Sequence, residues 1–144
     1  MTAPGNPALR QLALRALAER KEATAGAGAV AAAAKRAYED LTRVSAPLIG
    51  DVGINALTGR TLYLAQRQYP WLVHTREPEE WNGPFEQIVF CLERQDPAVA
   101  TEAAGAVLTT LAGLLVAFIG EPLTVHLLRK AWPDAFSDAT IEER

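Results

Sequence analysis

Apolar side chains recur three and four residues apart along most of this chain, which is the spacing of a buried helix face. The first such pattern follows Asn6 and Pro7, a capping residue and a proline suited to the first helical position. It ends near the glycine-containing stretch at residues 23–29, because glycine weakens a helix. We therefore treat residues 1–26 as an N-terminal helical arm.

A second pattern begins at Ala27 and forms a narrow apolar seam suited to close helix packing. Its members are Val30, Ala34, Ala37, Leu41, Val44 and Leu48. Pro47 is expected to end or bend this helix, because proline lacks the N–H group of the helical hydrogen bond. The seam and the N-terminal arm are the two surfaces on which we expect any dimer of this chain to form.

In the third helical pattern, residues 51–69, a polar strip lies opposite the apolar side. Arg60, Tyr63 and Arg67 share this strip at a period of about 3.6 residues. Gly59 interrupts the pattern, and the Tyr-Pro pair at its end should stop the helix. The three polar-strip residues are candidates for contact with a partner.

An irregular segment, residues 70–84, carries three prolines and an Asn-Gly pair. Four aromatic residues lie in or beside it: Tyr69, Trp71, Trp81 and Phe85. They either plug the open end of a helical bundle or anchor a partner, since Trp and Tyr dominate the energetics of protein interfaces. Trp71 and Trp81 are therefore candidate interaction residues.

Three further helices are predicted, over residues 85–94, 97–119 and 121–132. Asp96 and Pro97 suit the start of the middle one, and Gly120 suits its end. No internal repeat and no strand pattern is recognised.

The fold class that these patterns predict is all-α: a single helical bundle of five to six helices around a central, buried apolar helix, residues 97–119. Residues 27–134 would form this bundle, and residues 135–144 would be an acidic tail.

The apolar helix also raises the question of a membrane span, because eighteen uncharged residues separate Glu102 from Glu121 and a span needs about 20. Its acidic ends, and the absence of a basic cluster or aromatic belt, argue against a span. Leucines and a phenylalanine form one stripe, and small residues form another: Leu108, Leu111, Leu115 and Phe118, against Ala106, Thr109, Gly113 and Ala117. We expect a core helix. The alternative is a membrane-associated protein that inserts residues 103–119.

His126 is expected on the polar side of the last helix, beside Arg129 and Lys130. The order HLLRKA faintly resembles the motif of histidine phosphotransfer domains, four-helix bundles whose exposed histidine accepts a phosphoryl group. That resemblance covers six residues and implies His126 as the phosphoacceptor. Lys130 departs from it, because the family prefers glycine there, and the Trp-Pro pair that follows ends the helix where the family's helix continues.

Composition and charge argue against several classes of function. The net charge of −3 divides into +4 over residues 1–72 and −7 over residues 73–144, and an acidic chain without a dense basic tract argues against nucleic-acid binding. One cysteine, Cys91, and no secretory leader favour a reducing, cytoplasmic setting. His74 and the glutamates near it fit no standard metal site. We expect no catalytic residue, metal or cofactor.

The leading hypothesis is a non-enzymatic, bacterial-style regulatory or adaptor module that acts through helix-face contacts with a protein partner or as a homo-oligomer. It follows as much from the missing catalytic signatures as from the exposed residues. A signalling role through His126 is the second hypothesis.

Overall fold

The computed structural model describes residues 6–20, 26–72 and 84–136, and these form six α-helices, one short 3-10 helix and no strand. The all-α prediction is confirmed. In chain order the elements are α1 (Asn6–Arg20), α2 (Ala27–Ile49), α3 (Asp51–Gln68), the 3-10 helix η1 (Pro70–Leu72), α4 (Pro84–Leu92), α5 (Pro97–Ile119) and α6 (Glu121–Ala131).

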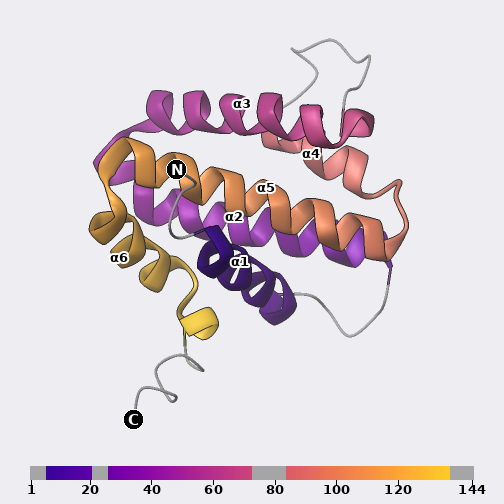
Figure 1. The fold of residues 1–144 in the computed structure, drawn as a ribbon, viewed down its shortest axis with the longest axis horizontal. Helices are drawn as coiled ribbons and strands as arrows, with labels where there is room; N and C mark the ends of the chain where they lie inside the picture. The colour runs from indigo at the N-terminus through magenta and orange to yellow at the C-terminus, as the bar shows by residue number, and fades with distance from the viewer. Residues whose placement is uncertain (1–5, 21–25, 73–83, 137–144) are drawn as a thin grey trace.

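Two long helices, α2 and α5, lie side by side and run in the same direction (Figure 1). α1 packs against both of them, and α3 packs against both from another side. α4 lies against α2, α3 and η1, whereas α6 lies against α2 and α5. The helix within the predicted N-terminal arm, α1, thus lies on the main body of the protein.

α5 contacts each of the other five α-helices. Residues 103–108 are buried without interruption, so this part of the helix is covered on all sides. Its last turn differs, because Ala117 and Phe118 are exposed although Phe118 belongs to the predicted apolar stripe. Among the described helices α5 alone is long and apolar enough to cross a membrane, and half of its apolar stretch is buried within the protein.

A single glycine joins each long helix to the next one. Gly50 links α2 to α3 with φ 87° and ψ 158°, and Gly120 links α5 to α6 with φ 93° and ψ 157°. This region of backbone space is open in practice to glycine alone. In both turns the glycine N–H bonds to the carbonyl four residues before it, and its carbonyl accepts from the N–H four residues after it.

The two turns belong to an internal structural repeat, which corrects the expectation that the chain has none. α2 and α5 are each 23 residues long, and their equivalent positions are 70 residues apart. Their burial follows the same register. Paired positions 30/100, 33/103, 34/104, 37/107, 41/111 and 45/115 are buried, and paired positions 47/117, 48/118 and 52/122 are exposed.

The contacts between helices are also repeated in the two halves. α1 lies against α5, and α4, the helix that precedes α5, lies against α2. Likewise α3 lies against α5, and α6 lies against α2. Each long helix therefore packs with helices of the other half, as an approximate two-fold axis between α2 and α5 requires.

The expectation that Pro47 ends α2 is wrong: it lies inside the helix, which continues to Ile49, because the Gly50 turn rather than the proline provides the stop. Most of the Ala-rich seam is not open for a dimer, because Val30, Ala34, Ala37 and Leu41 are buried within the chain itself, whereas Leu48 at the end of the seam is exposed.

Candidate functional site

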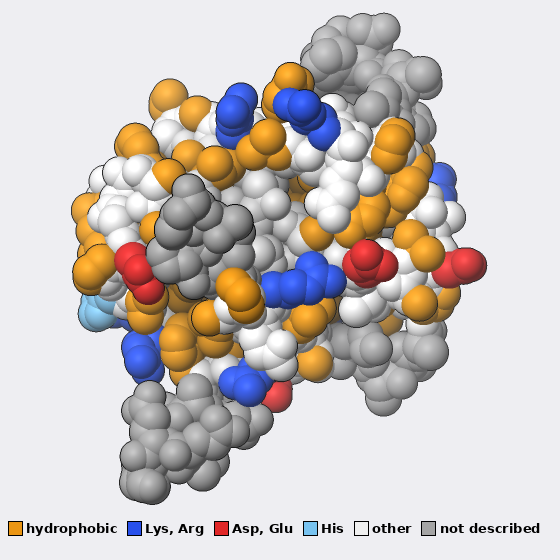
Figure 2. All heavy atoms as spheres, in the orientation of Figure 1, with side chains coloured by type: hydrophobic (Ala, Val, Ile, Leu, Met, Phe, Trp, Pro, Cys, Tyr) orange, Lys and Arg blue, Asp and Glu red, His pale blue; other side chains and the backbone are white. Residues whose placement is uncertain are grey.

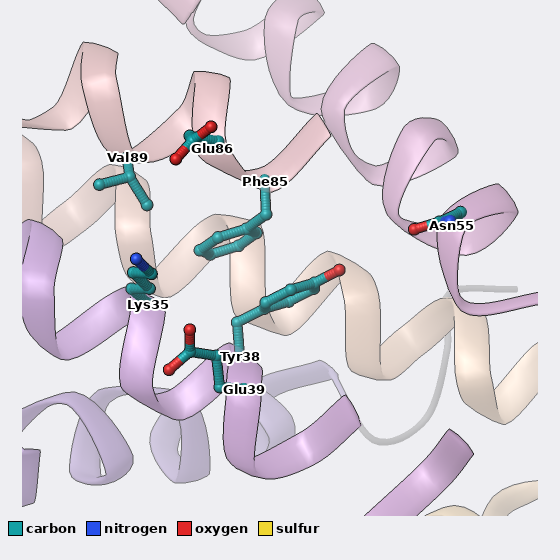
Figure 3. A pocket seen from close by; sticks show the side chains of 7 residues that line it. All are labelled: Lys35, Tyr38, Glu39, Asn55, Phe85, Glu86 and Val89. Atoms are coloured by element: carbon teal, nitrogen blue, oxygen red, sulfur yellow. The ribbon is translucent and has the colours of Figure 1, made fainter. Parts of the chain in front are cut away.

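A pocket of about 320 Å³ opens between α2, α3 and α4 (Figure 3). We call it the α2–α4 pocket. α2 contributes Lys35, Tyr38 and Glu39, α3 contributes Asn55, and α4 contributes Phe85, Glu86 and Val89. A volume in this range lies at the lower end of small-molecule sites.

Two stacked aromatic rings form the wall of this pocket. The rings of Tyr38 and Phe85 are nearly parallel, at 6°, and their centroids lie 4.0 Å apart. The Tyr38 hydroxyl is 2.8 Å from Oγ1 of Thr58, which donates to the carbonyl of Ile54 at 2.8 Å. Burial raises the pKa of the Tyr38 hydroxyl, against the opposing effect of its hydrogen bond to Thr58, so the phenol stays neutral near pH 7. These contacts fix the ring between α2, α3 and α4.

The polar groups of the pocket lie around these rings. Figure 3 shows Lys35 and Glu39 on α2, Glu86 above them on α4, and Asn55 to one side on α3. Lys35 and Glu39 are exposed, whereas Glu86 is half-buried. Two carboxylates and one ammonium group thus line the pocket.

A shallower groove continues from the pocket between α2 and α3. Glu39 and Asn55 line both, and the groove adds Arg43 and Asp51. Its volume is about 390 Å³, and it leads to the Gly50 end of the molecule.

The corresponding place in the other half has a different lining. Seventy residues on from Lys35, Tyr38 and Glu39 stand Gly105, Leu108 and Thr109. A β-carbon on Gly105 would lie 2.8 Å from a δ-carbon of Leu14, so α1 approaches α5 as closely as glycine permits. The charged and aromatic lining of the pocket is therefore a property of one half and not of the repeated architecture.

A second candidate surface lies at the end of the molecule that holds both glycine turns. Leu48 is 52% exposed and Val52 85% exposed beside Gly50, and Phe118 is 63% exposed and Leu123 38% exposed beside Gly120. We call these four residues the turn surface. Figure 2 shows hydrophobic side chains at the left-hand end, over these turns, as well as elsewhere on this face. Exposed apolar side chains grouped in this way mark interaction sites in soluble proteins.

The three polar-strip residues predicted for interaction lie on the outer side of α3. Arg60, Tyr63 and Arg67 are exposed, and the Arg60 guanidinium lies 5.7 Å from the centre of the Tyr63 ring. They are separate from the α2–α4 pocket, whose α3 residue is Asn55.

His126, Arg129 and Lys130 are exposed on α6. Arg129 lies over the ring of Phe136, 4.7 Å from its centre. Phe136 and Ala135 are buried, so the predicted acidic tail begins with two residues of the core, and residues 137–144 lie outside the described part.

The aromatic candidates have different environments. Trp71 is half-buried and tilted against Tyr69, with ring centres 5.6 Å apart. Trp81, like His74 and its neighbouring glutamates, lies outside the described residues. Cys91 is buried, and burial raises the pKa of its thiol although Arg94 opposes the shift. Within residues 6–20, 26–72 and 84–136, no cluster of His, Cys, Asp and Glu could hold a metal ion.

Two anchoring residues were not singled out from the sequence. Trp132 is fully buried, and its ring N–H donates to the carbonyl of Ala37 at 3.0 Å. Arg20, at the end of α1, binds Asp40 of α2 at 2.7 Å and donates to the carbonyl of Ala131 at 2.9 Å. The bonds to Ala37 and Ala131 join segments about a hundred residues apart, so no local pattern signals them.

The comparisons give no relative: no protein-family model, curated protein or solved structure matches the chain.

Proposed function

We propose that this chain is a non-enzymatic regulatory or interaction module, a single helical bundle around α5 that binds a partner protein through the turn surface. The observation that carries the proposal is the exposure of Phe118, Val52 and Leu48 at one end of the molecule, where they are the most exposed aliphatic and phenylalanine side chains among the large hydrophobic residues that the structure describes. Full burial of such a side chain contributes about 1.5–3 kcal/mol, and a partner that covers the exposed part of each side chain gains the corresponding share.

The charges beside the turn surface favour a partner over a second copy. Asp51 and Glu121 are exposed next to the two glycines. A head-to-head dimer through this end would bring four carboxylates together, which Coulomb repulsion opposes. A partner segment that combines apolar side chains with lysine or arginine complements the surface in both respects.

A peptide-display selection tests this proposal directly. The full chain is the bait, and its Val52→Ser, Phe118→Ser double variant is the counter-bait. We expect the enriched peptides to combine apolar and basic residues, and the single Phe118→Ser change to weaken their binding more than about tenfold, as for an interface hot spot.

Tyr63→Ser is the matched control, because Tyr63 is an aromatic residue that is 53% exposed, against 63% for Phe118, but lies on the outer side of α3. Peptides that bind the wild type and the double variant equally, or that are acidic, contradict the proposal. Sedimentation of the protein alone is the companion measurement. If the protein alone is a dimer that Phe118→Ser dissociates, the turn surface binds a second copy of the chain and not a partner protein.

Histidine phosphotransfer is the second candidate function, and the exposure of His126 beside Arg129 and Lys130 favours it. The two cations would stabilise a phosphohistidine. This function requires an acid-labile phosphoryl label that His126→Gln abolishes, and a wild-type protein that takes up no label from a phosphodonor kinase excludes it.

A further inference from the structure

We propose that the turn surface binds a two-fold symmetric partner, a homodimer that presents two identical apolar and basic segments side by side. This inference rests on the proposed function and specifies the partner. It starts from the place of the turn surface in the repeat. α2 and α5 run in the same direction, so the approximate two-fold axis between them runs along both helices and passes through the end that holds Gly50 and Gly120 (Figure 1).

The two turns form equivalent half-sites on either side of this axis. Each presents an exposed large apolar side chain two residues before the glycine, Leu48 or Phe118, and an exposed carboxylate one residue after it, Asp51 or Glu121. The two glycines have nearly the same backbone angles, so the half-sites have the same local geometry. Neither carboxylate forms an ion pair within the part of the chain that the structure describes. Leu48 and Asp51 thus make the first half-site, and Phe118 and Glu121 the second.

Both apolar side chains continue the buried side of their own helix. Leu48 follows the buried Leu41 by seven residues, and Phe118 follows the buried Leu111 by seven, which is about two helical turns. The sides of α2 and α5 that form the core therefore extend past the helices that cover them. A partner that continues the packing along the axis would cover both side chains at once.

The spacing of the half-sites fits a parallel pair of helices. α2 and α5 pack against each other, and the axes of packed helices lie about 8–10 Å apart. Two identical helices that pack in parallel have this spacing and a two-fold axis along their length, and two-fold dimers are the commonest oligomers. Such a pair can place one helix on each half-site with the two axes in line.

Charge selects a homodimer of another protein over a second copy of this chain. A lysine or arginine in each helix would pair with the carboxylate of its half-site. A second copy presents the same two carboxylates, Asp51 and Glu121, which repel their equivalents.

The two half-sites differ in strength. Phe118 is the only aromatic residue of the turn surface, and an aromatic ring buries more area than a leucine or a valine. A single segment therefore binds the Phe118 half-site first. In a pair, the second segment binds the Leu48 half-site as an intramolecular step, which raises the affinity of the whole.

The test presents two display libraries to the full chain. One holds single peptides, and the other holds the same peptides as parallel pairs on a leucine zipper, with the bare zipper as control. An enriched pair should bind at least about tenfold more tightly than its single peptide. Leu48→Ser should weaken the pair by at least about tenfold and the single peptide by no more than about twofold. Tyr63→Ser, on the outer side of α3, should change neither.

Failure of this inference and failure of the proposed function give different results. If pairs bind no more tightly than single peptides, or if Leu48→Ser weakens both alike, the symmetric partner is overturned and the proposed function stands. If neither library gives a binder that Phe118→Ser weakens, both are overturned. Leu48 and Phe118 are exposed, so these changes should leave the helix content unchanged, and circular dichroism of each variant checks this.

Discussion

The contact of α1 with α5 and the contact of α4 with α2 occupy equivalent places in the two halves and solve the same packing problem differently. At the first, glycine at 105 lets Leu14 approach the helix backbone, and the interface is apolar. At the second, the stacked rings of Tyr38 and Phe85 stand between the helices, and charged side chains line the remaining space. A smaller cavity of about 140 Å³ lies at the first contact, and its lining is almost entirely apolar: Leu14, Leu17, Ala18, Val30, Ala33 and Thr101. Equivalent helix contacts of a repeated scaffold can thus enclose different linings.

The largest expected effect concerns the end of the second half. Trp132 and Leu62 stand at equivalent positions, but Trp132 is fully buried and Leu62 is half-buried. Trp132→Ala should lower the free energy of unfolding by about 3–5 kcal/mol, because it leaves a cavity and removes the bond to Ala37. Leu62→Ala should cost clearly less. Chemical denaturation measures both, and equal losses would contradict the asymmetry.

The glycine turns should respond alike, since both adopt the same backbone conformation. Gly50→Ala and Gly120→Ala should each cost about 1–3 kcal/mol of unfolding free energy. Gly113→Ala is the control. A β-carbon at position 113 would meet no neighbouring side chain within 4 Å, so the change should stabilise by up to about 1 kcal/mol. If only one of the two turns tolerates alanine, the turns are not equivalent and the repeat does not extend to them.

Close packing at Gly105 predicts a difference between two matched substitutions. Gly105→Leu should destabilise by about 1–3 kcal/mol, because the new side chain meets Leu14. Lys35→Leu, at the equivalent and exposed position of α2, should stay within about 0.5 kcal/mol. Adding Leu14→Ala to Gly105→Leu should recover part of the lost stability. Adding it to Lys35→Leu should recover none. Thermal denaturation of the four variants tests this coupling.

The smallest expected effect is a pH dependence. Burial of the Asp40 carboxyl opposes its ionisation, but hydrogen bonds from Arg43 and Arg20 outweigh burial and hold its pKa below the ordinary value. The stabilisation is therefore present above the unfolded-state pKa of about 3.9 and is lost as the pH falls through the lower folded-state pKa.

Asp40→Asn should accordingly cost stability at pH 7 and less at pH 2–3. Urea denaturation at the two pH values measures the difference. An equal loss of stability at both would show that the ionised Asp40 carboxylate does not stabilise the fold. Arg43→Gln, which removes the more exposed partner, should reproduce only part of the effect.

Local signals in the sequence predicted the helices well. Pro97 and Gly120 mark the bounds of α5, because starts and stops act within one turn; Asp96 stands at the N-cap position but makes no capping hydrogen bond through its side chain. Pro47 misled for the same reason, since a proline in the last turns of a helix need not end it when a glycine turn follows. The pattern Ile-Gly followed by an acidic residue, at 49–51 and 119–121, was the available sign of the repeat.

The candidate sites could not be predicted in this way. The pocket depends on Tyr38 meeting Phe85, 47 residues later, and no periodicity encodes such a contact. Phe118 continues a buried stripe in the sequence but extends past the covering helices in the structure. Helical spacing predicts which residues lie on the same side of a helix. Tertiary packing decides how far along the helix that side is covered by other helices.

The arrangement of the two halves, parallel long helices with both glycine turns at one end, supports the repeat and the turn surface alike. The most direct test is a nitroxide label at Phe118→Cys, an exposed position, read by paramagnetic broadening of amide signals. The label should broaden residues 48–54 across the turn surface and spare residues 97–99, which lie about 30 Å away along α5 by helix rise. Broadening near residues 26–30, with residues 48–54 unaffected, would show that the long helices run in opposite directions and would contradict the account.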